Sequence, residues 1–220
     1  MEIHIYSNIQ YTTQSSLDDL RGQYAQLING PFTDITFVFN QNNQFQTVSA
    51  HKSVLALRSP VFAVMFTTPM VESKQSKIYL LDDPFVFKEL LHYIYTDTYS
   101  KIPDDVSFRQ ELLAMASKYQ VKGLVNTMEI EISTYLTMEN CIQLLVFSDT
   151  MFASELKRSA LQFIAMNYES LSCEESLHAL DPSLQCQIEQ YKCSVFRKGF
   201  FKLNGGNGGD KRTFRFCTIS

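Results

Sequence analysis

The 220-residue sequence predicts an α+β fold in which a small β-sheet is flanked by helices and followed by an all-helical extension. The runs rich in β-branched and aromatic residues, which predict strands, lie before residue 82. From residue 104 on, the apolar residues recur only at helical spacing. Hydrophobic residues make up 45% of the chain, which is enough to bury a full core. No fixed repeat length is present, so an α-solenoid of identical units is not indicated.

The amino-terminal part is predicted to place one helix ahead of the sheet. Residues 1–14 alternate weakly between apolar and polar side chains and are compatible with a single strand. Ser15 and Ser16 offer an N-cap for the helix, and Asn29-Gly30-Pro31 would end it. Because its apolar stripe precedes the first clear strand, the stripe either packs on the core or faces another subunit. The stripe consists of Leu17, Leu20, Tyr24 and Leu27.

The sheet is predicted to begin with a hairpin. Residues 34–39 form a buried strand, residues 40–43 a polar turn and residues 44–48 the returning strand. Two short helices and a third strand are expected next, at 50–57, 60–66 and 77–81.

The rest of the chain is predicted to be helical. Asp82-Asp83-Pro84 begins a helix that runs through Tyr95 on an amphipathic pattern. Two helices follow around 112–119 and 124–135, and Thr137 is expected to cap the next one. The last three helices are expected at 153–168, 173–180 and 182 to about 196.

The charges divide the chain into an acidic body and a basic tail. Residues 1–196 carry 13 basic and 22 acidic side chains, whereas residues 197–220 carry six basic ones and one acid. An acidic body argues against binding nucleic acid over a broad face. The basic tail is able to attract an acidic partner. The run from Asn204 to Gly209 has linker composition, so a solvated tail is favoured over one that binds nucleic acid.

Several classes of protein are disfavoured. No apolar stretch approaches the ~20 residues that span a bilayer, and no secretory signal is visible. The five cysteines are odd in number and lack CxxC spacing, which argues against a disulfide framework or a zinc site. We therefore expect a cytoplasmic and/or nuclear protein with no metal, no cofactor and no membrane partner. Four cysteines are expected to be small apolar fillers of helices: Cys141, Cys173, Cys186 and Cys193.

One long stretch of the sequence resembles the BTB/POZ domain. The matching segments are Phe32–Phe37, Ala50–Phe62, Met65-Phe66, Met70-Val-Glu-Ser73, Phe85–Thr96 and Ala114–Tyr119. Residues 148–164 are similar to the first helices of a BACK extension, and the resemblance as a whole covers about residues 17 to 170. It is closest to the speckle-type (MATH–BTB) and RCC1–BTB cullin-3 adaptors.

The resemblance, together with the local patterns outside it, divides the chain into four expected units. An amino-terminal segment comprises residues 1–14, and the BTB/POZ domain comprises residues 15–136. The BACK-like helical extension comprises residues 137–196, and the basic Gly-rich tail comprises residues 197–220.

The resemblance also implies a function, that of a dimeric adaptor recruiting cullin-3 to a RING ubiquitin ligase while another domain holds the substrate. The family's hydrophobic-x-Glu motif corresponds to Met70-Val71-Glu72, with Phe66 one turn upstream and Glu111 as a further cullin-contacting residue. In the alternative interpretation, Met70 covers the edge of the core and Glu72 is merely solvated. The stripe of Leu17, Leu20, Tyr24 and Leu27 resembles the family's dimer helix, in a homodimer or a BTB heterodimer.

Asp34 and Lys52 correspond to a structural acid–base pair of the family, with His51 beside them. A catalytic role for His51 with Asp34 is disfavoured, since the sequence holds no phosphate loop, nucleophile elbow or paired-carboxylate motif. The chain is therefore expected not to be an enzyme.

Two other functions remain open. The chain shows no stretch long enough for a MATH, kelch, ankyrin or RCC1 module, so the substrate receptor is missing, reduced to the helices after residue 137, or supplied by a heterodimer partner. A dimerising scaffold or regulatory partner of larger BTB proteins is the alternative to the adaptor. A transcriptional co-repressor ranks last, because only the short tail offers a basic segment.

Overall fold

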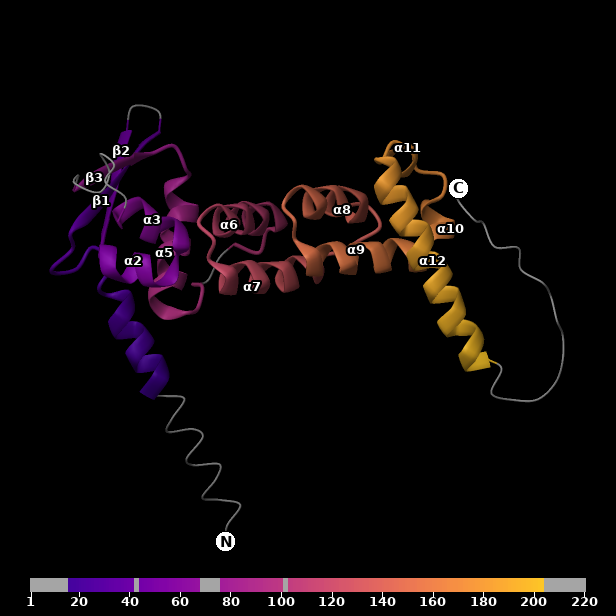
Figure 1. Cartoon of the computed structure of the whole chain (residues 1–220), viewed down its shortest axis with the longest axis horizontal. Helices are drawn as coiled ribbons and strands as arrows, with labels where there is room; N and C mark the ends of the chain where they lie inside the picture. Colours follow the sequence, from indigo (N-terminus) through magenta and orange to yellow (C-terminus); the bar gives the residue numbers. More distant parts are fainter. Residues whose placement is uncertain (1–15, 42–43, 68–75, 101–102, 204–220) are drawn as a thin grey trace, which may run out of the picture.

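The structure, a computed structural model, describes residues 16–41, 44–67, 76–100 and 103–203, with the main chain alone for Gln41 and residues 195–203. A sheet-and-helix unit lies at one end, successive helix pairs extend from it, and a long helix crosses the far end (Figure 1). The described part of the chain is therefore elongated, with the sheet near one extremity.

The sheet has three strands: β1 (Ile35–Gln41), β2 (Gln44–Ala50) and β3 (Lys77–Leu80). β1 lies in the centre, antiparallel to β2 and parallel to β3. Phe37 lies opposite both Val48 and Ile78, and these three side chains are buried on one face. The predicted hairpin and third strand are confirmed, as is the α+β class.

Four helices belong to the sheet unit: α2 (Lys52–Arg58), α3 (Pro60–Thr67), α5 (Pro84–Thr96) and α6 (Val106–Lys118). α5 begins where the sequence predicts, because the Asp83 carboxylate accepts the main-chain N–H groups of Phe85 and Val86 at 2.8 and 3.0 Å. Most of α5 is buried, and Phe87 packs against β1 with its ring centroid 4.8 Å from that of Phe37. α5 is thus the central helix of the domain.

Six helices of the described chain follow α6, and a further helix, residues 16–25, precedes the sheet. The six are α7 (Lys122–Ser133), α8 (Cys141–Thr150), α9 (Ser154–Met166), α10 (Tyr168–Leu171), α11 (Glu175–His178) and α12 (Pro182–Leu203). The main core reaches from β1 to Leu144 and Leu156, and a second core lies under α12. The first pair of extension helices therefore shares its core with the sheet unit.

Two predicted helix ends are wrong. Thr137 does not cap a helix, because α8 begins four residues later and the Asn140 side chain accepts the Thr137 N–H at 2.8 Å. The last helix continues to Leu203 rather than ending near Phe196, so part of the predicted tail is helical. Gly199 alone does not stop it, and the stronger stop signal in the sequence is Asn204-Gly205.

A buried carboxylate joins the domain to the helical extension. Glu129 of α7 is almost fully buried and accepts the N–H groups of Glu155 at 2.6 Å and Leu156 at 3.0 Å. These donors are in the first turn of α9, where main-chain N–H groups lack partners within the helix and the helix dipole favours a negative charge. α9 is therefore capped by a residue of another helix.

We expect Glu129→Ala to lower the free energy of unfolding by about 2 to 3 kcal/mol, because two buried N–H groups lose a charged acceptor. Glu129→Gln keeps an acceptor oxygen and is expected to cost less. Urea unfolding followed by circular dichroism measures both, with Glu139→Ala at an exposed position as the control. An Ala variant as stable as the wild type would contradict this role of Glu129.

Candidate protein-interaction surfaces

The helix formed by residues 16–25 projects from the sheet unit (Figure 1). Its exposed apolar side chains are Leu17, Leu20 and Tyr24, which are 48%, 47% and 52% exposed. The spacing of three and four residues places them on one face of the helix. Leu27, the fourth predicted interface residue, packs partly against the core of its own subunit. The predicted stripe thus divides into an exposed part and an anchoring part.

The base of this helix is attached to strand β2. Asn29, in the left-handed region with φ 57°, donates its main-chain N–H to the Ser49 carbonyl at 2.9 Å. The Asn29 side-chain oxygen accepts the Ser49 N–H at 2.6 Å. Asparagine tolerates this conformation better than most residues do. The pair of hydrogen bonds orients the helix where it leaves the domain.

Phe66 lies at the outer end of an aromatic stack that begins in the core. Its ring stacks on Phe62 with centroids 5.8 Å apart, and Phe62 stacks on Tyr119 at 4.7 Å. The Lys52 ammonium lies 5.7 Å from the Phe66 ring centroid. Phe66 is half-buried, so one part of the ring is held rigidly while another part stays accessible.

The other predicted cullin-binding residues are placed only in part. Glu111 is exposed on α6 beside the buried Leu112 and Leu113. Met70 and Glu72 lie outside the described residues, so the predicted apolar ledge near position 70 stays a prediction.

Asp34 and Lys52 meet through the main chain of α2. An Asp34 carboxylate oxygen accepts the Lys52 main-chain N–H at 2.7 Å, although Asp34 itself is exposed. His51, which precedes α2, places Nε2 2.9 Å from the Pro31 carbonyl oxygen. A carbonyl only accepts, so Nε2 carries the hydrogen, and in the neutral ring Nδ1 accepts from the Tyr95 hydroxyl at 2.9 Å. Both ring nitrogens of His51 therefore hold the start of α2 in place.

A polar cluster around Arg109 was missed by the sequence analysis. The Arg109 side chain is 8% exposed and donates to the carbonyl oxygens of Pro103 and Asp105 at 2.8 and 3.1 Å. Its guanidinium carbon lies 4.7 Å from the Tyr135 ring centroid, and Nε lies 3.8 Å from a Glu131 oxygen. A signal was present, because Arg109 shares its helical stripe with three buried apolar residues: Leu112, Leu113 and Ala116.

The cysteine prediction is correct at only one of the four positions. Cys141 is buried, and burial raises the pKa of its thiol. Cys173, Cys186 and Cys193 are exposed instead of filling helix interiors. Cys173 lies in the turn between α10 and α11, and Cys186 and Cys193 lie at exposed positions of α12, which packs against the body on one face only. Within the described ranges, no group of three or more His, Cys, Asp or Glu side chains is arranged to hold a metal ion. No described helix is both long and apolar enough to span a bilayer.

The exposed apolar side chains of helix 16–25 form a surface of the kind that contacts another protein. A family model of the BTB/POZ domain matches residues 24–136, which are 113 of the 220 residues. The chain therefore belongs to the BTB/POZ family, whose domains mediate contacts between proteins.

Tyr119, at the inner end of the aromatic stack, allows a test by pH. Its hydroxyl donates to an Asp82 oxygen at 2.9 Å, and burial together with the Asp82 charge raises its pKa well above the usual value near 10. Above about pH 10 the unfolded chain loses this proton while the folded chain keeps it, so the free energy of unfolding falls as the pH rises.

We expect Tyr119→Phe to reduce this alkaline slope by about 1.4 kcal/mol per pH unit, the contribution of one proton. Urea unfolding at several pH values above 9 measures the slope. Equal slopes for the variant and the wild type would show that Tyr119 does not retain its proton.

Proposed function

We propose that this chain is a dimeric BTB adaptor that recruits cullin-3 to a RING ubiquitin ligase for substrate ubiquitylation. The observation that carries the proposal is the exposed apolar face of helix 16–25 on a member of the BTB/POZ family. Such an adaptor performs no bond chemistry of its own, because its RING partner and the associated conjugating enzyme supply it. It would work in the cytoplasm and/or the nucleus.

Dimerisation is supported by the exposure of helix 16–25. Leu17, Leu20 and Tyr24 each leave about half of their surface uncovered in the single subunit. A contiguous apolar face on a projecting helix marks a contact with another protein, and an isologous contact between identical helices covers both at once. The partner is a second copy or another BTB protein. A dimer doubles the number of substrate and ligase contacts and so raises avidity.

Cullin binding is supported by the surroundings of Phe66. A half-buried aromatic ring held by a stack from the core is the kind of preformed anchor that interface hot spots use. Met70 and Glu72 follow it within the hydrophobic-x-Glu motif, and Glu111 adds an exposed carboxylate on α6.

The alternative function is a dimerising scaffold, or a regulatory partner of larger BTB proteins, without ligase activity. The described residues after 137 favour this alternative. They form helices that pack on the domain through α8 and α9 and on one another under α12, rather than a separate receptor module. In the adaptor, these helices or a heterodimer partner would have to hold the substrate, whose identity is open.

We expect Leu17→Glu with Leu20→Glu to convert the dimer into a monomer, raising the dissociation constant at least about a hundredfold. Each subunit contributes two apolar side chains, each worth roughly 2 kcal/mol when buried, and the new charges would have to be desolvated. Sedimentation equilibrium measures the change. Ile130→Glu, at an exposed apolar position on α7, is expected to leave the dimer intact. A wild type that sediments as a monomer at every concentration would contradict the dimer.

We expect the wild type to bind an amino-terminal cullin-3 fragment with a dissociation constant below tens of micromolar, and Met70→Ala with Glu72→Ala to weaken binding at least about tenfold. Isothermal titration calorimetry measures both. Met166→Ala with Glu169→Ala removes the same two residue types from exposed positions far along the chain, and this variant is expected to bind like the wild type. A dimer without measurable cullin-3 affinity would support the scaffold and exclude the adaptor.

A further inference from the structure

The far end of the molecule carries a mainly acidic surface. Between residues 159 and 191 the chain contains five acidic side chains and neither lysine nor arginine. All five are exposed, on and between α10, α11 and α12: Glu169, Glu174, Glu175, Asp181 and Glu189. The neighbouring basic side chains already have acidic partners, since Lys157 pairs with Asp149, Arg158 with Glu155, and Lys192, directly after this stretch, with Glu189. This surface therefore attracts positive charge.

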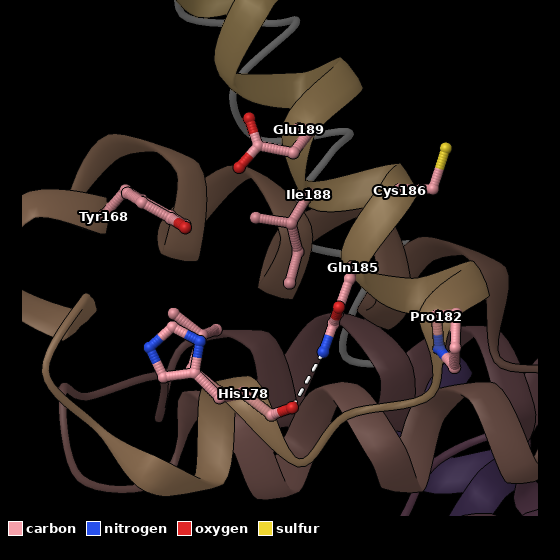
Figure 2. Close-up of a pocket in the computed structure, with 8 residues that line it drawn as sticks. Tyr168, His178, Pro182, Gln185, Cys186, Ile188 and Glu189 are labelled. Atoms are coloured by element: carbon pink, nitrogen blue, oxygen red, sulfur yellow. Dashed lines mark hydrogen bonds between the residues drawn. The ribbon is translucent and has the colours of Figure 1, made fainter. Parts of the chain in front are cut away.

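A hollow borders this acidic surface, and Glu189 is the one of the five acidic residues that lines it. It measures about 250 Å³ and is bounded by α10, α11 and the first turns of α12. In Figure 2, Tyr168, His178 and Glu189 surround the opening, and Ile188 points into it from α12. Leu177 and Pro182 add apolar lining. Pockets for drug-sized ligands measure roughly 300–1,000 Å³, so this one suits a single side chain.

The polar groups at the rim are suited to a cationic partner. The His178 Nε2 lies 2.9 Å from the Ser172 carbonyl oxygen and must donate to it, which leaves Nδ1 of the neutral ring as an acceptor. Lys192 shows how this rim binds a cation: its ammonium donates to the Glu189 Oε1 at 2.7 Å and lies 3.3 Å from the Tyr168 ring centroid. A carboxylate and an aromatic face are thus already used together for a positive charge.

The sequence after α12 has the complementary chemistry. Residues 211–216 read Lys-Arg-Thr-Phe-Arg-Phe, which contains three basic side chains and two phenylalanines. The separating run, Asn204 to Gly209, has linker composition.

The tail is long enough to return to the hollow. From Glu189 to Leu203 the helix rises about 21 Å, at 1.5 Å per residue. The eleven residues from Leu203 to Phe214 reach at most about 36 Å when extended, and a flexible chain of that length has a root-mean-square span of roughly 18 Å. A tether whose span matches the distance gives an effective concentration in the millimolar range, so weak contacts suffice.

We propose that residues 211–216 dock back on the acidic surface of the same chain, with one phenylalanine in the hollow and the basic side chains against the surrounding carboxylates. The tail then covers the mainly acidic surface of α10, α11 and α12, and a basic segment of another protein would have to displace it. This inference is independent of cullin binding and of dimerisation.

The chain carries its own probes for a test by disulfide trapping. Cys217 directly follows Phe216, Cys186 borders the hollow, and Cys193 lies two helical turns nearer to the end of α12; both helix thiols are exposed. An undocked tail meets Cys193 more often, because Cys193 is closer to Leu203. The full chain carrying Cys173→Ser is oxidised by air with a copper catalyst. Peptide mass spectrometry then compares the yields of the Cys186–Cys217 and Cys193–Cys217 bridges. We expect the Cys186–Cys217 bridge to exceed the Cys193–Cys217 bridge at least about threefold.

Charge and apolar variants separate docking from chance collision. Three changes are each expected to make Cys217 prefer Cys193 over Cys186. The first neutralises the tail with Lys211→Gln, Arg212→Gln and Arg215→Gln, the second removes its aromatic rings with Phe214→Ser and Phe216→Ser, and the third raises the salt to about 1 M. Neutralising the acidic surface with Glu174→Gln, Glu175→Gln and Glu189→Gln is expected to have the same effect. The control, which neutralises residues away from that surface with Glu111→Gln and Glu139→Gln, is expected to keep the preference for Cys186. Any of three outcomes would overturn the proposal. They are a preference for Cys193 in the unmodified tail, a preference for Cys186 that survives neutralisation of the charges, and bridges that form only between two chains.

Discussion

The contact between the sheet and its helices through aromatic rings supports the rest of the domain. Phe87 of α5 lies against both Phe37 and Phe39 of β1, with centroids 4.8 and 5.2 Å apart. Phe62 and Tyr119 extend the same cluster to α3 and to the end of α6. Since the rings come from β1, α3, α5 and the end of α6, their packing positions several segments that are distant in sequence. Phe66 owes its orientation at the surface to this chain of contacts.

The helical extension is a continuation of the domain rather than a tethered unit. Leu144 and Leu156 belong to the same buried cluster as the strands, and Glu129 caps α9 from α7. Interior packing transmits position, because well-packed cores deform little. The orientation of α8 and α9 relative to helix 16–25 is therefore set by the fold. Whatever the far helices bind is held at a defined distance from helix 16–25.

The two ends of the elongated molecule differ in chemistry. Helix 16–25 presents apolar side chains at one end, and α10, α11 and the start of α12 present carboxylates at the other (Figure 1). Burial of apolar side chains stabilises a contact without regard to charge. An acidic surface instead selects a basic partner, and salt weakens that selectivity by screening the charges. In a dimer formed through helix 16–25, the acidic surfaces of the two subunits are kept apart from the apolar interface. The arrangement allows two different contacts at once.

The sequence by itself determined the order and type of the elements, because apolar periodicity and the Asp83 and Pro84 signals act within a few residues. It also determined that Leu17, Leu20 and Tyr24 lie on one face, since helical spacing alone requires it. Only the tertiary structure decided that Leu27 turns to the core, that Glu129 and Arg109 become buried, and that three cysteines stay exposed. Burial depends on which elements meet, and those contacts join residues far apart in the chain. The partner of Lys52 is an instance: its main-chain N–H meets the Asp34 carboxylate only after the hairpin has folded back.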